Sequence, residues 1–411
     1  MGQDTLIFNG RIITETHYLA RGYVLIRDGR IASLGTDSSG LEAAGRAERA
    51  ERIDAGGLIV SPGFVDMHTH GIRDSDFMAS DAEGMVRGLA AYASFGVTRV
   101  CGATLANPWE RIIAQVALMR RAMEDREYGA LLAGAHIEGP WLNPSQKGGH
   151  ALEYLRLPEK AEVERLLGEV GDVITEVTYA PELPGAVWLT ETLAAQGILP
   201  SIGHSEASYE QAEAAILAGA RHVTHLYDAI NGYRENPREA LVMMPGVETA
   251  ALAHDAVSVE LNGCPVHVPI PFWSFIDKVK PRDKKVVVTD SLVGTGMPEG
   301  TVLTYKDGRQ VYVEKGVLRM IDKDPKIHGN LTGSAVTMNV ALGRLMQYTG
   351  LPVQEAVRWV SLNPARALGL DRETGSLKVG KWADLALFDD AVEVQRTFLK
   401  GRQVYRAGHR S

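Results

Sequence analysis

The stretch Pro62-Gly63-Phe64-Val65-Asp66-Met67-His68-Thr69-His70-Gly71 predicts a short buried strand that ends in two histidines. Proline and glycine at its start and glycine at its end mark the bounds of the strand. Residues two apart on a strand face the same way, so both imidazoles can reach one ion. Taken alone, the His68/His70 pair fits two packed imidazoles as well as it fits a metal site.

Further along the chain, similar apolar runs alternate with helical patterns. The segment from Ser80 to Ser94, for example, repeats its apolar residues at helical spacing. Repeated strand–helix units favour an α/β fold, here a (β/α)8 TIM-like barrel, which we place at residues 61–372. The eight candidate strands are Gly63 to His68, Val97 to Ala103, Leu131 to Ile137, Val173 to Tyr179, Leu199 to His204, His222 to Leu226, Val257 to Leu261 and Lys285 to Thr289.

Both ends of the chain read as short strands without a full core of their own. We therefore expect residues 1–60 and 373–411 to pair into one small β-sandwich domain, with the barrel inserted between them. A third strand-like stretch, Thr301 to Ile321, breaks the barrel rhythm and predicts a hairpin excursion with a turn at Asp307-Gly308. The strand-like runs at the ends are Thr5 to Phe8, Tyr23 to Ile26, Arg30 to Leu34, Asp384 to Phe388 and Thr397 to Tyr405.

Composition argues against several classes of protein. The 411 residues are 45% hydrophobic and 23% charged, with a net charge of -8 and no basic stripe, so a nucleic-acid partner is not expected. No apolar run reaches the ~20 residues of a membrane span, and no signal-peptide core follows Met1. With only two cysteines, a disulfide framework is not expected, and we predict a cytoplasmic enzyme for a small-molecule substrate.

Metal-competent side chains recur where the candidate strands end, which is the active-site edge of a TIM barrel. Glu138, His204, His225 and Asp290 join the histidine pair there, so five of the eight candidate strands carry such a group. Each histidine alone fits a structural role, and Glu138 alone fits a loop cap or an ion pair. Together, one carboxylate and two imidazoles would leave a coordination position open, as catalytic metal sites do. His136 fits a satisfied interior histidine better than a ligand.

These segments resemble the amidohydrolase superfamily and, within it, the N-acetylglucosamine-6-phosphate deacetylase family. The most specific match is His136-Ile137-Glu138-Gly139-Pro140-Trp141-Leu142-Asn143, followed by Lys147-Gly148-Gly149-His150. The resemblance covers nearly the whole chain and implies a metal-dependent deacetylation of an N-acetyl amino sugar 6-phosphate.

The resemblance also implies roles for individual residues. Glu138, His204 and His225 would bind the principal metal, and His68 and His70 a second one. Asp290 would be general base and then acid, and His150 would contact the substrate and polarise its carbonyl. Leu331 and Thr332 would line the acetyl pocket. The cofactor would be one or two divalent ions (zinc, iron or manganese), and the assembly a homodimer.

The segments that would select the substrate depart from the family pattern. Asp228-Ala229 stands where the family has Asn-Ala, and the arginine for phosphate is either Arg234 or Arg238. Pro265 occupies the place of a phosphate-binding histidine, and proline has no N–H to donate, so His267 becomes the candidate. An amidohydrolase for a non-phosphorylated N-acyl sugar or another N-acyl amine therefore stays open as an alternative. A non-catalytic scaffold is disfavoured because the ligand residues are all kept.

Overall fold

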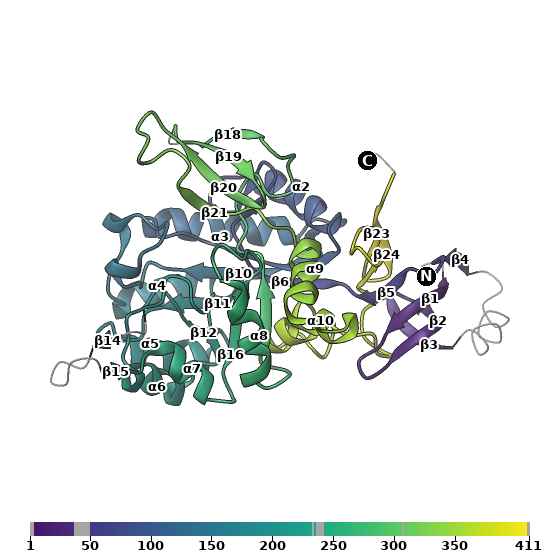
Figure 1. Ribbon diagram of the computed structural model, residues 1–411, viewed down its shortest axis with the longest axis horizontal. Helices are drawn as coiled ribbons and strands as arrows, with labels where there is room; N and C mark the ends of the chain where they lie inside the picture. The colour runs from purple at the N-terminus through teal and green to yellow at the C-terminus, as the bar shows by residue number, and fades with distance from the viewer. Residues whose placement is uncertain (1–3, 37–49, 232–233, 236–241, 306–307, 409–411) are drawn as a thin grey trace.

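The computed structural model describes residues 4–36, 50–231, 234–235, 242–305 and 308–408. Figure 1 shows a large barrel, a small β-domain beside it that contains both purple and yellow strands, and a separate sheet above the barrel. The predicted fold class, a TIM-like barrel with a small β-domain built from both chain ends, is confirmed.

Eight parallel strands form the barrel sheet, and they coincide with the eight predicted strands to within a few residues. The barrel begins to close where the backbone N–H of Asp290 donates to the carbonyl of His68 at 2.9 Å. The sixth strand is shorter than predicted because the backbone at His225 turns to a positive φ of 28° and leaves the extended region. In sheet order the strands are β6 (Phe64–Thr69), β9 (Val97–Ala103), β10 (Leu132–Glu138), β11 (Ile174–Tyr179), β12 (Leu199–Ile202), β13 (His222–Val223), β16 (Ser258–Asn262) and β17 (Lys285–Val288).

Helices pack around the outside of the barrel and bury their apolar faces in one large core. Their starts follow the sequence: the Asp81 side chain caps α2, and Ser208 and Gln211 form a reciprocal capping box on α6. No helix in the described part of the chain has the length and hydropathy needed to cross a bilayer. The helices are α2 (Ala82–Ala93), α3 (Trp109–Met123), α4 (Lys160–Val170), α5 (Ala186–Ala195), α6 (Tyr209–Ala218), α7 (Val247–Ala253), α8 (Ile270–Val279), α9 (Met338–Thr349), α10 (Val353–Trp359) and α11 (Leu362–Ala367), with 3-10 turns at Gly129–Leu131, Pro144–Gln146 and Leu152–Tyr154.

The two chain ends meet in a second eight-stranded sheet. Its order is β24-β23-β22-β5-β1-β2-β3, with β4 paired to β1. The join is β5, which runs parallel to β1 on one side and antiparallel to β22 on the other. The strands are β1 (Thr5–Ile13), β2 (Tyr18–Arg27), β3 (Arg30–Thr36), β4 (Glu51–Asp54), β5 (Ile59–Pro62), β22 (Leu385–Phe388), β23 (Val394–Leu399) and β24 (Arg402–Arg406).

The predicted excursion after the eighth barrel strand is a four-stranded antiparallel sheet, visible above the barrel in Figure 1. Its last strand returns to the barrel, because the Leu292 N–H donates to the carbonyl of Ser334 at 3.1 Å. Asp307 of the predicted turn lies outside the described residues. The strands are β18 (Val302–Thr304), β19 (Gln310–Glu314), β20 (Val317–Ile321) and β21 (Leu331–Ser334); two small ribbons elsewhere pair β7 (Gly71–Ile72) with β8 (Ser75–Asp76) and β14 (Arg234–Glu235) with β15 (Met243–Met244).

Candidate metal centre

Glu138, at the end of β10, lies at the centre of a ring of imidazoles. Its side chain is almost fully buried, and its two oxygens face different histidines. Oε1 lies 3.1 Å from Nε2 of both His204 and His225. Oε2 lies 3.1 Å from Nε2 of His70 and 3.4 Å from Nε2 of His150. Imidazoles from four segments of the barrel therefore converge on one carboxylate.

The two principal candidate ligands, His204 and His225, both turn a lone pair inward. His204 donates its Nδ1–H to the carbonyl of Gln146 at 2.7 Å, and His225 donates its own to the carbonyl of Asp228 at 3.0 Å. Because Nδ1 carries a proton in each ring, only Nε2 is left to bind a further proton or a metal ion, and the two Nε2 atoms lie 3.2 Å apart. Two lone pairs and a carboxylate oxygen at this separation repel one another unless a cation lies between them. The residues present therefore fit a divalent ion.

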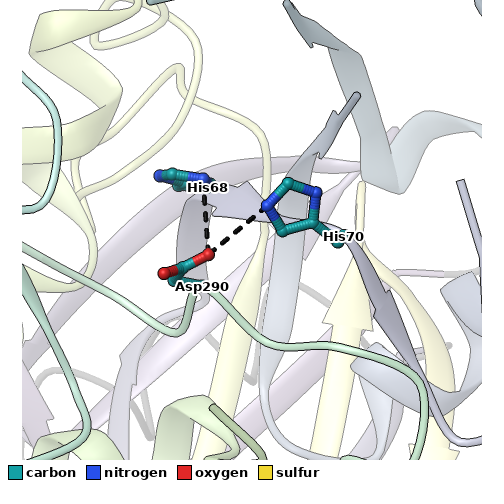
Figure 2. Close-up of side chains that lie close together, drawn as sticks. All are labelled: His68, His70 and Asp290. Atoms are coloured by element: carbon teal, nitrogen blue, oxygen red, sulfur yellow. Dashed lines mark ion pairs between the residues drawn. The ribbon is translucent and has the colours of Figure 1, made fainter. Parts of the chain in front are cut away.

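His68, His70 and Asp290 form the second part of the cluster. Figure 2 shows both imidazoles directed at the Asp290 carboxylate, and each Nε2 lies 3.4 Å from the same oxygen, Oδ1. The Nε2 of His68 is buried and forms no hydrogen bond of good geometry. The other oxygen of Asp290 accepts a hydrogen bond from the Asn262 amide at 3.0 Å, which fixes the carboxylate in place.

The electrostatics of the cluster favour bound positive charge. Burial alone raises the pKa of Asp290, but the imidazoles of His68 and His70 outweigh it and lower the pKa to about 2. Burial lowers the pKa of His70 and His225, yet the neighbouring carboxylates raise both to about 9. Without a metal the rings of His70 and His225 are therefore protonated at pH 7, and a divalent ion would take the place of those protons.

His150 differs from His204 and His225 because its ring proton lies on Nε2 and not on Nδ1. Its Nδ1 accepts a hydrogen bond from the Ala106 backbone N–H at 3.0 Å, so the ring proton sits on Nε2, facing Glu138. Burial lowers the pKa of His150 to about 4, and the ring is neutral at pH 7. The arrangement gives the site a neutral N–H donor beside the candidate metal position.

Three of the predicted substrate residues, Asp228, Ala229 and His267, lie near the cluster. Asp228 and Ala229 follow His225, and Ala229 accepts a hydrogen bond from the Ser205 N–H at 3.2 Å. Burial lowers the pKa of His267, but Cys264, Asp228 and Asp290 raise it overall, so the ring lies within electrostatic reach of the cluster.

The remaining predicted substrate residues are not joined to the cluster by the described contacts. The backbone of Arg234 lies in β14, its side chain is not described, and Arg238 lies outside the described residues. Leu331 and Thr332 begin β21, whereas Ser334, at the end of this strand, forms a β-bridge with Ser291, next to Asp290.

Sequence reasoning missed a polar group inside the barrel. Glu260, His222 and Glu176 are fully buried and lie close enough together to share an ion or protons. Burial and the nearby Glu260 raise the pKa of Glu176 well above its usual range. The signal that could have found them is a glutamate inside an otherwise apolar strand, as in Ser258-Val259-Glu260-Leu261, because an unpaired buried carboxylate is costly. His136 is an interior histidine as predicted, with Nε2 held by Thr178 Oγ1 at 2.7 Å.

The fold and the side chains at the strand ends define a TIM-barrel protein with a candidate metal centre. The model of the Amidohydrolase family matches residues 59–404, and the chain therefore belongs to the amidohydrolase family, whose members depend on metal ions.

Several relatives are similar over nearly the whole chain. The N-acetylglucosamine-6-phosphate deacetylase of Vibrio furnissii is 30% identical over 90% of this chain and 88% of its own length. The N-acetylgalactosamine-6-phosphate deacetylase of Escherichia coli O157:H7 is 30% identical over 95% of this chain and 97% of its own length. A variant of the Mycobacterium smegmatis N-acetyl-D-glucosamine-6-phosphate deacetylase, solved with N-acetyl-D-glucosamine-6-phosphate, superposes with a TM-score of 0.84. It is 29% identical and covers 98% of this chain and 100% of its own.

Proposed function

We propose that this chain hydrolyses the acetamide of an N-acetyl amino sugar 6-phosphate, N-acetylglucosamine-6-phosphate or a close relative of it, to acetate and the amino sugar. The observation that carries the proposal is the convergence of four imidazoles on Glu138 beside an ionised Asp290. Relatives that act on two different N-acetyl sugar 6-phosphates support the substrate class. They disfavour the alternative of a non-phosphorylated substrate.

The proposed metal ligands are Glu138, His204 and His225, with His68 and His70 as the site of a second ion. When bound, a divalent ion (zinc, iron or manganese) supplies Lewis-acid polarisation of water and of the amide carbonyl. The inward lone pairs described above supply the ligand atoms, and Glu138 faces both sets of histidines.

Asp290 is the proposed proton carrier. Its low pKa keeps the carboxylate ionised and able to accept a proton from the attacking water. The same carboxyl group then delivers that proton to the amide nitrogen, so that a neutral amine can leave. Asn262 holds one oxygen of Asp290, which leaves the other facing the histidines.

His150 is the proposed donor to the substrate. Its Nε2–H points into the cluster, where it can donate to the carbonyl oxygen as negative charge develops there. We infer that the acetyl group lies near Leu331 and Thr332, and the sugar near Asp228 and Ala229. Arg234 and His267 are the proposed contacts to the 6-phosphate. We further infer a cytoplasmic homodimer in which residues 61–372 form the catalytic domain and residues 1–60 and 373–411 the β-domain.

Steady-state kinetics on N-acetylglucosamine, N-acetylgalactosamine and their 6-phosphates test the function. Charge-assisted hydrogen bonds to the phosphate should raise kcat/KM for the 6-phosphates about tenfold to hundredfold over the free sugars. Equal kcat/KM with and without phosphate would count against the proposed substrate class. Absence of acetate release from all four sugars would count against the deacetylase function itself.

A further inference from the structure

Three candidate metal ligands use Nε2 and are anchored through Nδ1, but their anchors differ in kind. His204 and His225 donate to backbone carbonyls, which no side-chain substitution removes. His68 lies against a side chain instead: its Nδ1 is 3.2 Å from Oε2 of Glu260, across the barrel interior on β16. The orientation of His68 therefore depends on one residue that the proposed chemistry does not use.

We propose that Glu260 is a positioning residue that accepts the Nδ1–H of His68 and so keeps its Nε2 directed at the metal centre. This inference rests on the proposed metal-dependent function. A ligand histidine that donates its other ring N–H to a carboxylate is fixed in one tautomer and one orientation, and becomes a more basic ligand. Because Nε2 of His68 lies 3.5 Å from Glu138 Oε1 and 3.4 Å from Asp290 Oδ1, a turned ring would leave the cluster.

The position of Glu260 is itself fixed by hydrogen bonds at Oε2. Oε2, the oxygen that faces His68, also accepts the backbone N–H of His225 at 3.0 Å. One carboxylate oxygen thus joins the first barrel strand to the turn that carries a principal ligand. Oε1 lies 3.1 Å from Nε2 of His222, and the side chain has no exposed surface.

The His222 ring is held in turn, so the carboxylate has a fixed neighbour behind it. Its Nδ1 lies 2.6 Å from the Ser258 hydroxyl, which also lies 3.1 Å from the carbonyl of Arg221. The hydroxyl has one proton, and the carbonyl can only accept, so Ser258 donates there and accepts from the imidazole. The ring of His222 therefore keeps a fixed position beside Oε1 of Glu260.

Glu176 supplies a matched control. It is equally buried in the same interior layer, but its recorded ion-pair contact is with His222 at 3.9 Å. Among the described contacts, no hydrogen bond joins Glu176 to His68. Replacing either glutamate by glutamine removes one buried carboxyl group, but only the change at Glu260 alters a contact to a candidate metal ligand.

The test is zinc affinity, measured by chelator competition on Glu260→Gln, Glu176→Gln, His68→Gln and the double variant His68→Gln/Glu260→Gln. If the protein binds more than one zinc ion, the affinity to compare is that of the binding step that His68→Gln weakens. We expect Glu260→Gln to weaken that step about tenfold to hundredfold, the usual effect of removing such a partner. Glu176→Gln should stay close to wild type. The double variant should match His68→Gln, because no imidazole remains to be positioned.

Wild-type zinc affinity in Glu260→Gln would overturn the proposal. An equal loss in Glu176→Gln would do the same, as would an undiminished effect of Glu260→Gln in the His68→Gln background. If Glu260→Gln does not fold, a crystal structure of the zinc-loaded wild-type protein decides. The proposal requires His68 to ligate through Nε2 with Nδ1 still on Glu260, and ligation through Nδ1 contradicts it. None of these measurements uses a sugar, so a failed deacetylase assay and a failed positioning role remain distinguishable.

Discussion

At the scale of single residues, backbone conformation aims the reactive side chains. His204, His225 and Asp290 follow three barrel strands, and all adopt positive φ values, of 49°, 28° and 46°. L-residues other than glycine rarely occupy this region, and such strained positions cluster at functional sites. Each functional residue therefore lies two positions after the end of its strand, and the turn there directs its side chain toward the common centre. The sequence alone could not show this, because histidine and aspartate, although enriched at positive φ, adopt it in only a minority of cases.

The Asp290→Asn substitution should stop turnover and leave the metal bound. Asparagine keeps the shape of the side chain but cannot accept and return a proton at neutral pH. We expect kcat to fall by about 10²–10⁴, the usual share of a general acid–base. The measurement is kcat on the metal-replete variant together with its metal content. Near wild-type turnover in a fully loaded Asp290→Asn protein would refute the proposed role.

The Glu138→Ala substitution should empty the principal metal site. Glu138 is the group that all the surrounding imidazoles share, and its removal leaves a cluster without the central negative charge. Elemental analysis after dialysis should show the loss of at least one bound ion per chain. His136→Gln is a suitable control, because His136 is buried nearby but bonds to Thr178 rather than to Glu138. Unchanged metal content in Glu138→Ala would contradict the assignment.

At the scale of elements, the strands could be predicted from the sequence, but the contacts between side chains inside the barrel could not. Apolar runs such as Val97 to Ala103 mark buried parallel strands because both faces of such a strand are covered. The four-stranded excursion was predicted only as far as Ile321, because β21 follows a loop whose pairing depends on a long-range register. Contacts such as His68 to Glu260 join residues 192 positions apart, and a single sequence carries no record of that distance.

A buried ion pair joins the barrel to the β-domain and should contribute strongly to stability. Arg99 of β9 lies 2.9 Å from Asp384, just before β22, and both side chains are at most 8% exposed. Removing one partner of such a pair leaves an uncompensated buried charge, so Asp384→Asn should lower the free energy of unfolding by about 3–5 kcal/mol. Chemical denaturation measures the change.

The exposed pair between Arg282 and Glu355 serves as the control for that measurement. The Arg282 side chain is 61% exposed, so Glu355→Gln should cost only about 0–1 kcal/mol. Both variants should keep kcat, because neither residue contacts the candidate metal centre. Equal losses in the free energy of unfolding of the two variants would contradict the argument that burial makes the Arg99–Asp384 pair the more costly one to break.

At the scale of the whole molecule, the barrel brings several buried carboxylates together, and their negative charge must be balanced by nearby positive charge. Carboxylates of Glu138, Asp290 and Glu260 lie in or below the strand ends, and imidazoles are the side chains that face them. A metal ion and the protons on these imidazoles therefore compete for the same negative charge. Stability, metal affinity and pH must be coupled in this protein.

That coupling predicts opposite pH trends for the metal-free and metal-loaded protein. In the absence of metal, His70 and His225 have pKa values raised to about 9, against about 6.5 in an unfolded chain. A raised pKa gives stability that is complete below pH 6.5 and is lost as the pH rises through 9. The Tm of the chelator-treated protein should therefore fall by several degrees between pH 6.5 and 9. The gain in Tm on adding zinc should grow over the same range, because fewer protons compete with the ion. Thermal scans with and without zinc measure both trends, and a metal-free Tm that stays level or rises toward pH 9 would contradict the charge balance proposed for the centre.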